Sequence, residues 1–168
     1  AAELLAVAAF REGRHAQAFP TFGSERTGAP VVSFCRMSDG PIRTHEPIAH
    51  PDALIVQDPT LLHQVDVFAG VADGALVLIN TARDAEGLGL GELAQRVRLA
   101  TLAATEIARE HLGRPLPGAP LLGGFAALTG EISIDAVEAA IRGRFSGATA
   151  DGNVAAARAA YAQEHTHA

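Results

Sequence analysis

The chain has 168 residues, of which 48% are hydrophobic, and therefore fits one domain with a sizeable core. Its formal net charge is -6, its thirteen basic residues are all Arg and form no run, and aromatic residues make up only 5%, which excludes the concentrated positive patch of a nucleic-acid-binding protein. No apolar stretch approaches the roughly 20 residues of a membrane span, and we expect no signal peptide. The single cysteine, Cys35, rules out an intramolecular disulfide and a Cys-based metal cluster, so we expect a cytoplasmic protein without a membrane partner.

The first twelve residues predict a helix. Its apolar residues fall on one stripe: Leu4, Leu5, Ala8 and Ala9. Gly13 ends this helix. Because the helical pattern starts at residue 1 with no capping residue before it, we expect that a strand and a turn upstream of it are missing.

Short strands follow the first helix. They are expected at residues 15–19 and 31–37, with a Gly- and Pro-rich loop at 20–30 between them and a hairpin-like partner strand at 42–45. Three continuous apolar runs of strand length come next, at 53–57, 75–80 and 97–103. Such runs, separated by connections long enough for helices, are typical of a buried parallel sheet.

The last third of the sequence predicts helices. They are expected at residues 106–112, 121–128, 134–145 and 153–162. Gly113 and Gly130 end the first two, and Ser133 caps the third. The sequence therefore predicts a three-layer, Rossmann-like α/β domain over residues 1–163, with a mostly parallel sheet, a β-hairpin insertion, a helical C-terminal third and a flexible tail at 164–168.

The sequence shows no catalytic constellation. Cys35 lies inside a predicted strand, which favours a buried, inert thiol, and no Gly-x-Ser-x-Gly elbow or paired carboxylates occur. His45, Glu46 and His50 lie near one another, but zinc needs fixed geometry and a recognisable ligand spacing, so all seven histidines are expected on the surface or hydrogen-bonded. The spaced glycines at 87–91 lack the strand–loop–helix context of a nucleotide site.

The loop at residues 19–30 is the strongest candidate site. It contains Gly23, Ser24, Glu25, Arg26, Thr27 and Gly28. The two glycines permit close approach of the backbone to a ligand, and Arg26 could hold a phosphate or carboxylate through two parallel hydrogen bonds. The alternative is a tight crossover loop with a local Glu25–Arg26 pair of little energetic weight. The residue types alone leave both interpretations open.

The same segment resembles a known family. Residues 18–31 are similar to the Gly-x-Glu-Arg-x-Gly-Ala-Pro-Val signature of the gamma subunit of 2-oxoacid:acceptor oxidoreductases, such as pyruvate:ferredoxin oxidoreductase. Further resemblances follow in the family's order, at residues 38–43, 51–59, 80–81, 121–124 and 153–161. Ala160 stands where the family usually has Gly, and this chain begins inside the helix that in the family follows a strand and a Gly-rich turn.

The resemblance implies an accessory subunit that works with alpha, beta and delta-type subunits. Such complexes oxidatively decarboxylate a 2-oxoacid (pyruvate by default, or phenylglyoxylate or another 2-oxoacid) to its acyl-CoA and pass the electrons to ferredoxin or to an NAD-reducing subunit. Thiamine diphosphate, Mg and [4Fe-4S] clusters would lie on the other subunits, and coenzyme A would be the co-substrate. Residues 23–28 would form a loop on the coenzyme A side or at a subunit interface.

This resemblance assigns no catalytic residue and no metal ligand to the chain itself. Three alternatives stay open: a free-standing nucleotide-binding Rossmann-like module without catalysis, an enzyme that acts alone, and a purely structural interaction protein.

Overall fold

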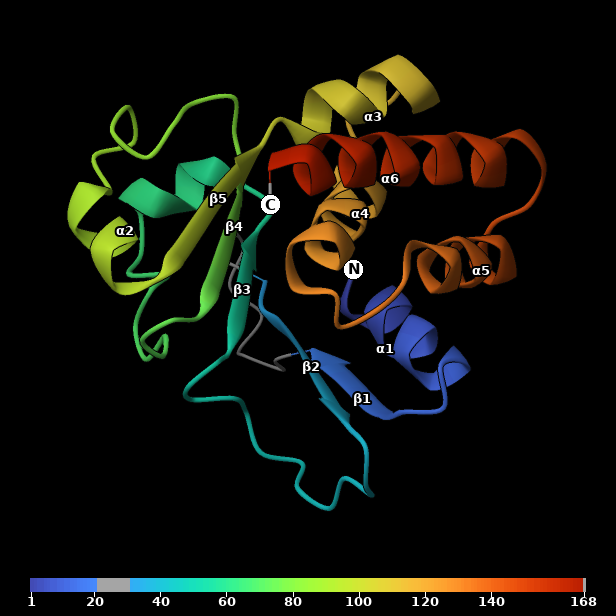
Figure 1. Ribbon diagram of the computed structural model, residues 1–168, viewed down its shortest axis with the longest axis horizontal. Coiled ribbons are helices and arrows are strands. Elements are labelled where there is room, and N and C mark those ends of the chain that lie inside the picture. Colours follow the sequence, from blue (N-terminus) through green and yellow to red (C-terminus); the bar gives the residue numbers. More distant parts are fainter. Residues whose placement is uncertain (21–30, 168) are drawn as a thin grey trace.

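The computed structural model describes residues 1–20 and 31–167 of the chain (Figure 1). In chain order the elements are α1 (Ala2–Arg11), β1 (His15–Pro20), β2 (Ser33–Ser38), β3 (Ala53–Val56), the 3-10 helix η1 (Pro59–His63), β4 (Leu76–Asn80), α2 (Gly91–Arg96), β5 (Arg98–Leu102), α3 (Ala104–Leu112), α4 (Gly118–Thr129), α5 (Ile134–Arg144) and α6 (Gly147–His167). The predicted α/β class, with a parallel sheet and a helical last third, is confirmed.

The parallel sheet has the strand order β3–β4–β5. All five residues of the central strand β4 are buried, as expected for a strand of a sheet that is covered on both faces. Successive side chains point to opposite faces, so Leu76 and Leu78 join the core under α4 and α6, whereas Val77 and Ile79 join the core on the side of η1 and α2 (Figure 1). Helices on both faces of the sheet make three layers.

A second, two-stranded sheet corrects one prediction. Strand β2 pairs antiparallel with β1, in a register that runs from His15 opposite Ser38 to Pro20 opposite Ser33. The predicted partner strand at 42–45 is wrong, because that segment has no strand structure and is mostly exposed. Prolines at 41 and 47 flank it, and proline cannot donate to a strand ladder.

Helix α1 packs between this two-stranded sheet and α5. Its buried residues are Leu5, Ala8 and Ala9, and Gly13 reverses the chain with a φ of +80°. Three polar contacts link this N-terminal region to residues more than 115 positions away: Arg14 to Glu131 at 3.0 Å, Ser133 N to Glu12 at 2.6 Å, and Arg144 to Glu3 at 2.8 Å.

The C-terminal helices pack on one another and supply much of the main core. Ser133 caps α5 as predicted, since its hydroxyl accepts from the backbone N of Ala136 at 3.0 Å. Helix α6 begins at Gly147, six residues before the expected start, and continues to His167. The segment expected as a flexible tail is therefore helical as far as it is described, and Glu164 within it is only 6% exposed.

Candidate functional site

The loop residues singled out from the sequence, Gly23, Ser24, Glu25, Arg26, Thr27 and Gly28, lie outside the described residues. The two ends of the loop are described. Pro20 precedes it and Ser33 follows it, and both line the same cavity, of about 740 Å³. The described residues on either side of the candidate loop therefore lie at one cavity.

The cavity collects basic side chains from separate elements. His111 lies near the end of α3, Arg114 follows that helix, and Arg144 ends α5; all three line the cavity. The first residues of α1, Ala1 and Ala2, line it as well, and a helix N-terminus carries a partial positive charge. Glu3 also lines the cavity and pairs with Arg144 at 2.8 Å, so the preference for an anionic ligand rests on His111, Arg114 and the helix N-terminus.

Asn80 connects the carboxyl ends of the parallel strands. Its side-chain amide donates to the carbonyl oxygen of Gln57 at 2.9 Å and to the hydroxyl of Thr105 at 2.8 Å. Its side-chain oxygen accepts from the backbone N of Ala104 at 3.0 Å and of Thr105 at 3.2 Å. Asn80 therefore caps α3 from the neighbouring strand, which explains why Ala103, with no polar side chain, can precede that helix.

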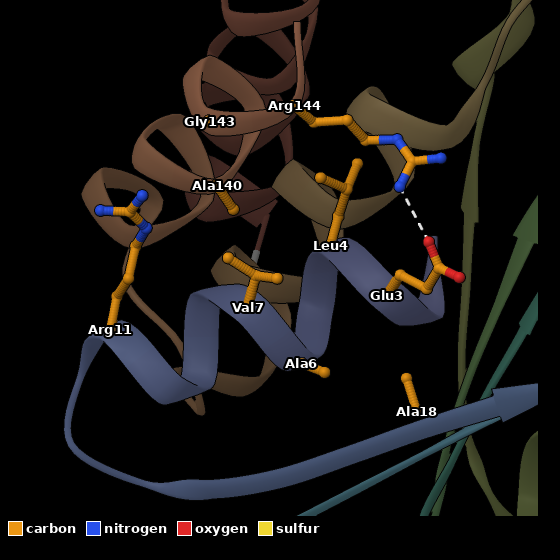
Figure 2. A pocket seen from close by; sticks show the side chains of 9 residues that line it. All are labelled: Glu3, Leu4, Ala6, Val7, Arg11, Ala18, Ala140, Gly143 and Arg144. Atoms are coloured by element: carbon orange, nitrogen blue, oxygen red, sulfur yellow. Dashed lines mark hydrogen bonds and ion pairs between the residues drawn. The ribbon is translucent and has the colours of Figure 1, made fainter.

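A smaller groove, of about 440 Å³, lies between α1, β1 and α5 (Figure 2). Its walls include small side chains from three elements: Ala6, Ala18, Ala140 and Gly143. The ion pair between Glu3 and Arg144 closes one end, and Arg11 stands at the other (Figure 2). The groove is mostly apolar between charged ends and contains no group suited to covalent chemistry.

Cys35 lies on β2 as the sequence predicts, but its side chain packs against the main core half-buried rather than buried. Burial raises the pKa of its thiol from 9.0 to about 11. At neutral pH the thiol is protonated, and only the thiolate is a nucleophile. Cys35 is therefore poorly suited to act as a nucleophile.

We predict a pH profile for this thiol. In the folded protein, alkylation of Cys35 by iodoacetamide should stay slow at pH 8–9 and rise steeply only near pH 11, because the folded state holds the proton more tightly. In denaturant the alkylation rate should rise near pH 9.0, the ordinary pKa of the thiol. The free energy of unfolding should fall between pH 9 and about 11, because in this range the Cys35 thiol has lost its proton in the unfolded chain but keeps it in the folded protein. Equal rates at pH 8 in folded and denatured protein would contradict this.

The other motifs considered in the sequence do not converge on a site. His45 lies 2.6 Å from the side-chain amide of Gln17, whereas His50 bonds to the carbonyl oxygen of Gly70 at 3.0 Å. Within residues 1–20 and 31–167, no three His, Cys, Asp or Glu side chains are placed to hold a metal ion. In the glycine segment at 87–91, Gly87 N donates to Asp84 at 2.7 Å, which makes a local turn.

No helix in the described part of the chain combines the length and the apolar character needed to cross a bilayer.

Two structurally important residues carried little signal in the sequence. Asn80, and Gly123 on α4, which lies against the backbone of Ala157, stand out in the sequence only as points of family resemblance, and nothing in their local sequence shows what they contact. A polar residue at the end of an otherwise apolar strand run was the available hint for Asn80.

Comparison with known proteins gives a consistent result. Residues 1–163 match the family model described as pyruvate ferredoxin/flavodoxin oxidoreductase. The pyruvate/ketoisovalerate oxidoreductases common subunit gamma of Thermococcus kodakarensis is 46% identical over 162 residues, covering 96% of this chain and 87% of the relative. Pyruvate synthase subunit PorC of Methanosarcina barkeri is 46% identical over 142 residues, covering 84% and 76%.

Solved structures agree with these matches. The crystal structure of pyruvate oxidoreductase subunit PORC from Thermotoga maritima superposes with a TM-score of 0.78 at 31% identity, covering 96% of this chain and 86% of that one. A keto/oxoacid ferredoxin oxidoreductase gamma subunit from Geobacter sulfurreducens, at 21% identity, has a TM-score of 0.70 and supports the fold alone. The chain therefore belongs to the pyruvate ferredoxin/flavodoxin oxidoreductase family and, within it, to the gamma subunits.

Proposed function

We propose that this chain is the gamma subunit of a complex that oxidatively decarboxylates a 2-oxoacid to its acyl-CoA and passes the electrons to ferredoxin. The observation that carries the proposal is the 46% identity to a gamma subunit over 96% of the chain. Pyruvate is the proposed substrate, because that relative is named for pyruvate and ketoisovalerate and the Methanosarcina relative for pyruvate synthase. A branched-chain or aromatic 2-oxoacid such as phenylglyoxylate, and NAD as acceptor, are the alternatives.

The proposal assigns the redox chemistry to partners. Alpha, beta and delta-type subunits would carry thiamine diphosphate, Mg and the [4Fe-4S] clusters. The chain's own part concerns coenzyme A. Pro20 and Ser33, on either side of the candidate loop, line a cavity that also holds His111 and Arg114, and coenzyme A is a polyanion that these two side chains and Arg26 would attract.

Co-purification from the native source tests the complex. We expect the chain to elute with thiamine- and cluster-binding subunits, identified by mass spectrometry, and the pool to oxidise pyruvate in a coenzyme A-dependent reaction that reduces ferredoxin. A different preferred 2-oxoacid would change the substrate and keep the proposed role. Recovery of a lone, colourless chain under gentle conditions would instead favour a free-standing nucleotide-binding module.

The proposed role of the loop in binding coenzyme A is tested by a separate variant in the purified complex. Arg26→Ala should raise the KM for coenzyme A by about tenfold or more, because a hydrogen bond to a charged group contributes roughly 1.5–3 kcal/mol, and should leave the KM for pyruvate unchanged. Arg43→Ala is the matched control, since Arg43 is exposed in a neighbouring loop. If both variants bind coenzyme A as the parent does, the loop has no part in that step.

A further inference from the structure

The larger cavity, of about 740 Å³, has a buried polar side chain on its wall. Asn153 lies on α6 one turn after Thr149, lines the cavity and is 7% exposed. Its side-chain nitrogen donates to the carbonyl oxygen of Thr149 at 2.9 Å. Its side-chain oxygen accepts no hydrogen bond from residues 1–20 and 31–167. Because a buried amide oxygen is normally hydrogen-bonded, Asn153 is suited to a donor on a molecule in the cavity.

The free groups of Asn153 match the edge of one nucleobase. An Asn side chain has an acceptor oxygen and two N–H groups, and Thr149 takes one N–H. The oxygen and the second N–H are complementary to adenine, whose 6-amino group donates and whose neighbouring ring nitrogen accepts. The bond to Thr149 also fixes which end of the amide is which. The amide therefore does not turn round to suit hypoxanthine, which has an acceptor oxygen in place of the amino group.

The surroundings of Asn153 suit a flat, apolar base. Gly152, the residue before it, lies against α3, because a Cβ there would be 2.9 Å from Cδ2 of Leu112. Other apolar residues from the start of α4 and from the junction of α5 and α6 line the same cavity: Ala119, Phe145 and Ala148. Apolar walls with a few placed polar groups are typical of sites for small organic ligands.

The charged end of a nucleotide also has partners at this cavity. His111 precedes Leu112 at the end of α3, and Arg114 follows it by two residues; both are exposed and line the cavity. A base packed against Leu112 therefore leaves its phosphates beside these two basic side chains. The cavity thus combines groups for the base and groups for the phosphates.

We propose that this cavity binds the adenine base of a nucleotide and that Asn153 recognises its 6-amino group. The nucleotide is the adenosine end of coenzyme A, so the inference rests on the proposed function. In that function the thiol at the other end of coenzyme A reacts with an acyl group on a partner subunit. The arm that carries the thiol therefore leads away from this chain, and the adenine end is the part that this chain holds.

Inhibition of the purified complex tests the base preference without any variant. Adenosine 3′,5′-bisphosphate, which is the nucleotide end of coenzyme A without its arm, should compete with coenzyme A. Inosine 3′,5′-bisphosphate, which has hypoxanthine instead of adenine, should bind about tenfold more weakly or worse, because a bidentate contact to a base edge discriminates by roughly that factor. Equal inhibition by the two compounds would overturn the proposal.

Variants of the cavity assign the preference to one residue. Asn153→Leu should weaken the adenosine compound until the two inhibitors differ by less than about twofold, since it removes the groups that read the base. Arg114→Ala should weaken both compounds by the same factor, because both carry the same phosphates. Gln57→Leu is the matched control: Gln57 is another amide that lines the cavity, and it is exposed. A preference that survives Asn153→Leu, or that disappears in Gln57→Leu, would contradict the assignment.

Pantetheine separates recognition of the base from damage to the fold. It carries the thiol arm without the nucleotide, so its rate of use as co-substrate should be the same in the parent complex and in Asn153→Leu. A loss of pantetheine-dependent activity in that variant would mean that Asn153 acts through the structure rather than through the base.

The two proposals can fail separately. A complex that discriminates between the two bisphosphates but oxidises the 2-oxoacid without any need for coenzyme A would keep the adenine site and remove the proposed function. A reaction that depends on coenzyme A without a preference for adenine would keep the proposed function and remove the adenine site.

Discussion

Replacing Gly123 with alanine is expected to destabilise the fold by about 3 kcal/mol or more, because the added methyl group has no room. A Cβ at Gly123 would lie 2.0 Å from the carbonyl oxygen of Ala157 and 2.7 Å from its carbonyl carbon. Both obstacles are backbone atoms of α6, so no side chain can move aside; α4 and α6 must separate. For a domain of this size the melting temperature should fall by roughly 6–12 °C.

Gly118→Ala is the matched control, because Gly118 lies on the same helix and a Cβ there meets nothing within 4 Å. That substitution should leave stability unchanged or raise it slightly, since alanine restricts the unfolded chain. Thermal unfolding followed by circular dichroism measures both variants. If they melt together, α4 and α6 do not pack through Gly123.

The second large effect is expected at Asn80. Asn80→Ala should lower the free energy of unfolding by about 3–4 kcal/mol, because it leaves the carbonyl oxygen of Gln57 and two backbone amides at the start of α3 without their partner. Asn80 is 5% exposed, so water cannot readily replace the lost bonds. Urea unfolding gives the magnitude, and hydrogen exchange at Ala104 and Thr105 should accelerate selectively.

Thr105→Ala separates the capping role from general damage. It removes only the bond between the Asn80 amide and the Thr105 hydroxyl and should cost about 1 kcal/mol. If Asn80→Ala proved no more destabilising than Thr105→Ala, the bonds of Asn80 to Gln57 and to the start of α3 would not contribute measurably to stability.

The sequence predicted best where burial forces a continuous apolar pattern. The strand runs at 53–57, 75–80 and 97–103 became β3, β4 and β5, because a central parallel strand must be apolar on both faces. Helix ends were equally predictable where the backbone conformation requires a particular residue. Gly113 and Gly130 adopt φ of +71° and +65°, which glycine tolerates.

Contacts between segments far apart in the chain were harder to predict from the sequence. The sequence predicts the strand at 31–37 but pairs it with 42–45 rather than with β1, because a half-buried two-stranded sheet leaves little pattern to specify register. The contact between Gly123 and Ala157 likewise depends on tertiary packing. The candidate loop at 23–28 was recognised by its motif and stays a prediction, as does the domain boundary at 163.

The linkage of α1 to α5 has a consequence for synthesis on the ribosome. Ile134, where α5 begins, follows Arg11 by about 120 residues, and a ribosome adding about 5–20 residues per second reaches it roughly 6–25 s later. During that interval the nascent α1 can pack on β1 and β2 but has no α5 to cover Leu4 and Val7. Helix α1 is therefore made well before the helix that completes its enclosure, and until α5 emerges Leu4 and Val7 stay open to contact with other chains.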